Sequence, residues 1–318
     1  MDNLSKQIIV HKKKKNTLMQ DIIKYKYIYM LLFPGLLFFI IFAYVPMYGI
    51  QLSFKDYWIN KGIWGSPLAG IDGLDKFRML LVNKEFLNAF KNTLVISGLK
   101  LVVGFPIPII IALLLNELTS VKLKKVLQTI FTFPHFLSWV ILSGIVMTLL
   151  RSDGTLNNII YALGGQRIDF MLNPSIFRGV LVFTDIWKEA GWSAIMYLAA
   201  MSSIDQTLYE VATIDGANRW NRMIHVTWPG ISTMAAMLLI LAVGNTMNAN
   251  FDQIFNLYNP SVFKYSDIID TYVYRVTFQM QADYGFSTAV GLFKGVVNCG
   301  LLLTANQIVK KFNQSSLF

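Results

Sequence analysis

Six long apolar runs, separated by shorter polar segments, dominate the pattern of hydrophobic and polar positions along the chain. Each run reaches or exceeds the roughly 20 residues that an α-helix needs to cross the hydrocarbon core of a bilayer. The runs are continuous and do not alternate apolar with polar positions, so they predict helices. The predicted spans are 27–50, 86–116, 126–150, 177–204, 230–250 and 284–309. The predicted fold class is therefore all-α, a polytopic membrane protein with six transmembrane helices.

The composition agrees with this pattern and narrows the class of protein. Of 318 residues, 54% are hydrophobic and 14% are charged, whereas soluble domains carry about 25% charged residues. The net charge of +10 could indicate nucleic-acid binding, but the lysines cluster beside the apolar runs, which is typical of membrane orientation. A single cysteine allows neither an intrachain disulfide nor a thiolate cluster, and the sequence predicts no metal site and no cofactor.

Basic residues predict which side of the membrane each segment faces. An even number of spans places both termini on one side, together with loops 117–125 and 205–229. These four segments hold 14 Lys and Arg in 69 residues, against 9 in 94 residues for the loops of the other side. Because cytoplasmic segments carry the excess of Lys and Arg, both termini are predicted to be cytoplasmic. The predicted organisation is a basic cytoplasmic tail 1–26, a first transmembrane helix 27–50, an extracytoplasmic loop 51–85, a membrane core 86–309 and a cytoplasmic tail 310–318.

The cytoplasmic loop 205–229 has the pattern of two short helices joined by a turn. Asp205 and Asn218 can cap the two helices, and Gly216 supplies the backbone freedom that ends the first. Pro229 fits the first turn of the following span. Each short helix has an apolar face: Leu208, Val211 and Ala212 on the first, and Trp220, Met223 and Ile224 on the second. Such a compact pair of helices could bind in a cleft of a partner protein. The alternative is a helix-turn-helix that connects two spans and binds no partner.

The same loop resembles the EAA loop of ATP-binding-cassette (ABC) importer permeases. The family pattern is E-A-A, three residues, G, nine residues and then I-x-L-P. Val211, Val226 and Trp228 replace the first Ala, the Ile and the Leu of that pattern. Six residues match the pattern and its sugar-importer form, which has D-G-A around the glycine: Glu210, Ala212, Asp215, Gly216, Ala217 and Pro229.

Shorter matches extend the resemblance along nearly the whole chain. They point to the complex-sugar or polysaccharide branch of the binding-protein-dependent transport inner-membrane components. The matching segments, in chain order, are 34–35, 44–50, 92–94, 114–118, 134–136, 186–192 and 272–275. The resemblance implies the type I ABC importer permease fold in the bacterial inner membrane, with a five-helix core at 86–309 preceded by one N-terminal helix.

The resemblance also implies a set of partners. A second, homologous permease would complete the translocation path, and two ATPase subunits would each bind one EAA loop. An extracytoplasmic binding protein would deliver the sugar or oligosaccharide. The sequence contains no G-x-x-x-x-G-K-[ST] phosphate loop, so this chain is expected to be non-catalytic and ATP hydrolysis is expected in the partner ATPase.

Polar residues inside predicted spans are costly, and they mark candidates for the substrate path. The fourth span carries a charged and aromatic face made of Asp185, Lys188, Glu189 and Trp192. A sugar needs hydroxyl partners and an aromatic platform, which this face offers, but an internal ion pair explains the charges equally well. In the fifth span, Asn245 and Asn248 share a face and can either bind carbohydrate or form hydrogen bonds between helices.

Three further polar residues in the spans have simpler explanations. Lys91 and Lys100 of the second span are expected to snorkel or to form ion pairs. His135 follows a proline in the third span and is expected to be a hydrogen-bonded core residue.

Two other functions compete with the permease. An ion-coupled secondary transporter would use the carboxylates of the fourth span as its coupling site, but it has no need of an EAA-like loop. A membrane enzyme, such as a glycosyltransferase acting on a lipid-linked sugar, would need a cluster of catalytic carboxylates or metal ligands, and the sequence presents none.

Overall fold

The computed structural model describes residues 22–280 and 283–311, and these residues form helices, turns and loops without a β-strand. The chain divides into two units, one ending at Gln51 and one beginning at Leu52. The first unit contains α2 (Lys26–Phe39), a π-helical turn (Ile40–Tyr44) and α3 (Val45–Met47). None of the residues in these three elements is buried within the chain, and they are apolar all round, as expected of a membrane span.

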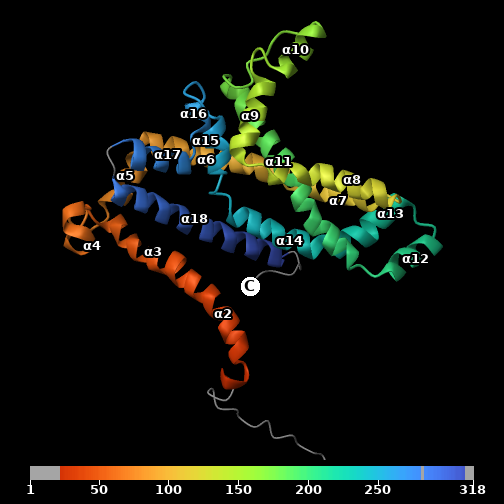
Figure 1. Ribbon diagram of the computed structural model, residues 1–318, viewed down its shortest axis with the longest axis horizontal. Helices are drawn as coiled ribbons and strands as arrows, with labels where there is room; N and C mark the ends of the chain where they lie inside the picture. The colour runs from red at the N-terminus through yellow and green to blue at the C-terminus, as the bar shows by residue number, and fades with distance from the viewer. Residues whose placement is uncertain (1–21, 281–282, 312–318) are drawn as a thin grey trace, which may run out of the picture. The chain divides into compact units, whose positions relative to one another are not determined.

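The second unit holds the remaining helices (Figure 1). Its first half contains α4 (Gly62–Gly65), α5 (Asp75–Val82), α6 (Lys84–Gly104), α7 (Pro106–Asn116), α8 (Val121–Thr132), α9 (Trp139–Leu150) and α10 (Thr155–Ala162). Its second half contains α11 (Pro174–Ser202), α12 (Gln206–Ile214), α13 (Arg219–Arg222), α14 (Trp228–Gly244), α15 (Phe251–Leu257), α16 (Phe263–Ser266), α17 (Ile269–Tyr274) and α18 (Tyr284–Lys311). In Figure 1, α12 and α13 lie at one end of this unit, and α5 and α17 lie at the opposite end.

Within the described residues, five helical runs are long and apolar enough to cross a membrane: Lys26–Phe54, Lys84–Asn116, Trp139–Ala162, Arg219–Gly244 and Tyr284–Lys311. The 29-residue helix α11 is also long enough to cross a membrane, and it carries four charged residues, namely Arg178, Asp185, Lys188 and Glu189. The all-helical membrane fold predicted from the sequence is thus confirmed, with six spans as an approximate count.

Two of the predicted spans are interrupted. In the third, Pro134 falls in a 3₁₀ turn (Phe133–Phe136) between α8 and α9, because proline cannot donate the backbone hydrogen bond that would continue α8. The fifth predicted span ends early, since α14 stops at Gly244 and α15 begins only at Phe251. The segment 245–250 contains Asn245, Asn248 and Asn250, and these polar residues could equally form one face of a continuous helix, so the sequence alone does not reveal the break.

Helix starts in the second unit follow the capping residues of the sequence. Asn83 accepts a hydrogen bond from the backbone N–H of Phe86 at the start of α6 (2.9 Å). Ser138 caps α9, and Asn173 caps α11 immediately before Pro174. These side chains satisfy backbone donors that have no partner within the helix.

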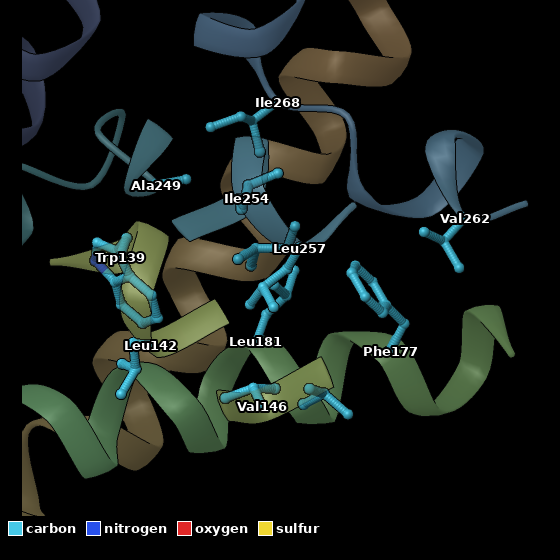
Figure 2. Close-up of a cluster of buried hydrophobic side chains, with 12 residues drawn as sticks. Trp139, Leu142, Val146, Phe177, Leu181, Ala249, Ile254, Leu257, Val262 and Ile268 are labelled. Atoms are coloured by element: carbon cyan, nitrogen blue, oxygen red, sulfur yellow. The ribbon is translucent and has the colours of Figure 1, made fainter. Parts of the chain in front are cut away.

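A buried apolar cluster joins α9, α11 and α15 (Figure 2). Trp139 and Leu142 of α9 pack with Leu181 of α11 and with Ile254 and Leu257 of α15. This cluster fixes the short helix α15 against the long helix α11. The segment that interrupts the fifth span, 245–250, is therefore held beside α11, where the charged residues of the fourth span lie.

Candidate functional site

The loop 205–229 folds as the predicted pair of short helices. Asp205 caps α12 by accepting a hydrogen bond from the backbone N–H of Thr207 (3.0 Å), and this bond lowers the pKa of the Asp205 carboxyl below its ordinary value. Asn218 caps α13 by accepting from the N–H of Asn221 (2.8 Å). The chain then passes through a π-helical turn (Met223–Thr227) into α14.

Gly216 ends α12 in the left-handed conformation, with φ of +76°. Its N–H donates to the carbonyl of Thr213 (3.1 Å), and the N–H of Ala217 donates to the carbonyl of Ala212 (2.9 Å). This pair of hydrogen bonds is the Schellman arrangement, in which glycine is favoured because it has no β-carbon. The turn sets the angle at which α13 leaves α12.

Two side-chain hydrogen bonds make the loop a single body attached to the membrane helix α14. The hydroxyl groups of Tyr209 in α12 and Thr227 lie 2.9 Å apart, and Thr227 is buried directly before α14. The guanidinium of Arg222 donates to the hydroxyl of Thr213 (3.0 Å), which ties α13 to α12. The loop and α14 are therefore connected without a flexible linker, and a displacement of the loop would also displace α14.

The residues of the EAA-like pattern and several apolar side chains face outward from this body. Glu210, Asp215, Gly216 and Pro229 are exposed, and Ala212 and Ala217 are half-buried. The exposed apolar side chains are Leu208, Val211, Ile214, Trp220, Ile224 and Trp228. Exposed apolar side chains grouped on a small polar knob are typical of a protein-binding surface.

A second feature is a cavity of about 700 Å³ between the helices of the second unit. Its wall is formed by α6, the start of α7, α11, α14, the interrupting segment 245–250 and Asp270 of α17. The two membrane helices that flank the loop, α11 and α14, both contribute to this wall. A polar cavity beside an interrupted membrane helix is the kind of place where transporters bind their substrates.

The cavity divides the charged face predicted for the fourth span. Asp185 and Glu189 line the cavity, whereas Lys188 and Trp192 do not. Successive helical residues are turned by about 100°, so the four side chains cover a wide arc and the cavity meets only one edge of it. The other edge faces the 3₁₀ turn between α8 and α9, where the Trp192 ring stacks on the ring of His135 (centroids 4.5 Å apart).

His135 contacts residues at both ends of this arc, Glu189 and Lys188. Its Nδ1 lies 2.7 Å from Glu189 Oε2, and its backbone carbonyl accepts a hydrogen bond from Lys188 Nζ (2.5 Å). Lys188 Nζ is also 3.5 Å from Glu189 Oε1. His135 is thus hydrogen-bonded, as expected, but it is half-buried in the 3₁₀ turn and is not a core residue. The cluster orients the Glu189 carboxylate at the cavity wall.

Asn245 and Asn248 also line the cavity, and the two side chains are hydrogen-bonded to each other. They belong to the interrupting segment 245–250, in which two backbone groups, the N–H of Met247 and the carbonyl of Ala249, bond to side chains of other helices. The N–H of Met247 donates to Asn298 Oδ1 of α18 (3.0 Å). Asn250 has φ of +71° and caps α15, while its amide donates to Asp185 Oδ1 (3.0 Å).

Lys100 of α6 is the central residue that sequence reasoning did not single out for the path. Its Nζ lies 2.9 Å from Asp185 Oδ1 and 3.1 Å from the carbonyl of Ala249, and it also donates to Gln253 Oε1. The residue forms an ion pair, one of the two roles expected for it. An isolated charge inside an apolar run was the only signal, and it did not identify the partner 85 positions away.

Asp270, the remaining carboxylate of the cavity wall, is paired in the same way. Its Oδ1 lies 2.5 Å from Lys294 Nζ of α18. Each cavity carboxylate therefore has a lysine near it, and the charges of the wall are balanced within this chain.

Comparison with known proteins gives the context of these features. Residues 104–293 match the family described as the binding-protein-dependent transport system inner membrane component. The chain is 41% identical over 312 residues to the polygalacturonan/rhamnogalacturonan transport system permease protein YteP of Bacillus subtilis, covering 98% of this chain and 96% of the relative. It is 43% identical over 294 residues to Protein LplB of the same organism, covering 92% and 91% of the two chains.

A solved structure agrees with these sequence matches. A chain in the crystal structure of a bacterial alginate ABC transporter in complex with an alginate pentasaccharide-bound periplasmic protein superposes with a TM-score of 0.85 at 38% identity. The superposition covers 95% of this chain and 100% of that one. The chain therefore belongs to the family of binding-protein-dependent transport system inner membrane components, the membrane-spanning permease subunits of ABC transporters.

Proposed function

We propose that this chain forms one half of the translocation path of an importer for oligosaccharides derived from polysaccharides. The observation that carries the proposal is the pairing of the polar cavity with the outward-facing loop, which are joined by α11 and α14. The relative that transports polygalacturonan and rhamnogalacturonan and the neighbour that transports alginate support this substrate class.

The loop is proposed to bind the ATPase. Glu210, Asp215 and Gly216 are exposed at its surface, and exposed apolar residues surround them. The proposed contact set is the EAA-like pattern, namely Glu210, Ala212, Asp215, Gly216, Ala217 and Pro229. Helix α14 has 17 residues and rises about 1.5 Å per residue, so it is about 25 Å long. It connects the loop to the cavity wall at 245–250, and a movement of the loop would therefore displace this wall.

The remaining partners follow from this assignment. A single docking loop receives one ATPase, so a second permease with its own loop is proposed to complete the path, with two ATPases on the cytoplasmic side. An extracytoplasmic binding protein is proposed to deliver the substrate, by analogy with the alginate transporter, whose crystal structure contains a pentasaccharide-bound periplasmic protein. The excess of Lys and Arg in 1–26 and in the loops on the same side supports cytoplasmic termini.

Within the cavity, Asp185, Glu189, Asn245 and Asn248 are proposed to contact the passing sugar, because their side chains line it. Lys188 and Trp192 are proposed to act indirectly, since both contact His135, which holds Glu189. Amide and carboxylate groups can exchange hydrogen bonds with sugar hydroxyls, and a transient site needs only a few of them.

Replacing Asn248 with alanine is expected to lower oligosaccharide uptake at limiting substrate about two- to tenfold, the equivalent of one hydrogen bond. ATP hydrolysis stimulated by the loaded binding protein is expected to persist. The measurement is uptake and ATPase activity of the complete complex in proteoliposomes. Asn256→Ala is the matched control, because the Asn256 amide also bonds to a residue nearby in the chain but does not line the cavity. Equal uptake by both variants would contradict the assignment of Asn248 to the path.

A further inference from the structure

Ser97 of α6 presents a buried hydroxyl group to the central cavity. The residue is only 7% exposed, and it lines the cavity one helical turn before Lys100. Among the described residues, Ser97 Oγ has no hydrogen-bond partner. Burying a polar atom without a hydrogen-bond partner lowers the stability of the fold, so a buried hydroxyl of this kind suggests a role other than stability.

Neighbouring hydroxyl groups in the helices behave differently. Thr93, one turn earlier in α6, donates to the carbonyl of Ala89 (2.8 Å), and Thr184 of α11 donates to the carbonyl of Val180 (2.8 Å). Bonding to the carbonyl four residues earlier is the usual way for a hydroxyl inside a membrane helix to be satisfied. Ser97 does not make this bond and keeps its hydroxyl available at the cavity wall.

The charges around Ser97 indicate which chemical group it can receive. The three N–H groups of Lys100 are matched by three acceptors: Asp185, the carbonyl of Ala249 and Gln253. The lysine therefore offers no free donor to a carboxylate on the substrate, and the other charged groups that line the cavity are carboxylates. A serine hydroxyl both donates and accepts, which matches a sugar hydroxyl.

We propose that Ser97 is a substrate contact of the translocation path, at which its hydroxyl exchanges hydrogen bonds with a hydroxyl group of the oligosaccharide. The proposal rests on the function proposed above and adds the helix α6 to the path, on which the sequence had placed no substrate residue. It also assigns this part of the wall to sugar hydroxyls. Carboxylate groups of an acidic sugar would be bound elsewhere.

The test uses Ser97→Ala in the complete transporter. Galacturonan, rhamnogalacturonan and alginate oligosaccharides serve as probes, and the one that wild type takes up best is carried forward. Uptake at limiting concentration is expected to fall about two- to tenfold, the effect of one hydrogen bond. The thermal unfolding midpoint of the complex is expected not to fall, because the hydroxyl has no partner within the described part of the chain.

Thr132→Val is the matched control. Thr132 Oγ1 is the other buried side-chain atom without a partner in the described residues, and it lies in α8 outside this cavity. Removing its hydroxyl is expected to leave uptake unchanged, and Ser97→Thr is expected to retain most of the wild-type uptake. Wild-type uptake by Ser97→Ala, or a loss matched by Thr132→Val, would overturn the assignment of Ser97. A wild-type complex that takes up none of the probes with ATP would instead refute the proposed function.

Discussion

Replacing Gly216 with valine is expected to reduce both uptake and ATPase stimulation by the loaded binding protein at least tenfold, while the chain still inserts into the membrane. Gly216 has φ of +76°, a conformation that costs a residue with a β-carbon about 1–2 kcal/mol and is worst for a β-branched one. The substitution would break the Schellman turn and change the angle between α12 and α13. The proposed docking body would then no longer fit the ATPase.

Gly164→Val separates this effect from backbone strain in general. Gly164 has φ of +85°, and for both glycines the described residues, apart from the adjacent ones in the chain, leave 4 Å of open space around the position that a β-carbon would take. The two substitutions therefore impose similar backbone strain, but Gly164 lies outside the loop 205–229. Co-purification of the ATPase with each variant is the direct measurement. A Gly216→Val complex that retains its ATPase and transports normally would show that the loop is not the coupling element.

Replacing Lys100 with methionine is expected to destabilise the folded chain by about 3–5 kcal/mol, the usual effect of removing one partner from a buried ion pair. Asp185 would keep its negative charge at the half-buried cavity wall with only Asn250 bonded to it among the described residues, and the carbonyl of Ala249 would lose its side-chain donor. Because that carbonyl lies in the interrupting segment 245–250, the cavity wall would be disturbed as well. Very little assembled, active complex is therefore expected.

The double variant Lys100→Met/Asp185→Asn tests the cause of this loss. The asparagine removes the unpaired charge and keeps an oxygen that can accept from Asn250, so assembly is expected to recover substantially. Lys91→Met is the matched control on the same helix, because Lys91 is exposed and the same roles were expected for both lysines. Assembly is measured by the monodispersity and thermal unfolding of the detergent-purified complex. Normal assembly of the Lys100→Met single variant would contradict the importance of the ion pair.

The features that depend on local patterns were predicted from the sequence. The membrane helices follow from long apolar runs, and the two caps and the left-handed turn of the loop follow from Asp205, Asn218 and Gly216. The family was also predicted correctly, because the spacing within one short loop is specific. These features are encoded within a few residues of each other.

The features that were missed depend on contacts between distant parts of the chain. The pairing of Lys100 with Asp185 joins two spans, and nothing near either residue specifies it. The fifth span was predicted to continue through 245–250, with Asn245 and Asn248 interpreted as polar residues on one face of a helix. The interruption is stabilised by Lys100 and by Asn298, a side chain of the last span, so it becomes visible only once the helices are packed.

Transport by the purified complex in proteoliposomes is the decisive measurement for an ATP-driven importer. The proposed complex contains this chain, a second permease and two ATPases, with the loaded binding protein on the extracytoplasmic side. We expect oligosaccharide accumulation that requires ATP on the side of the loop 205–229 and continues after proton and sodium gradients are collapsed. Accumulation driven by an imposed proton or sodium gradient in the absence of ATP would contradict the proposed function.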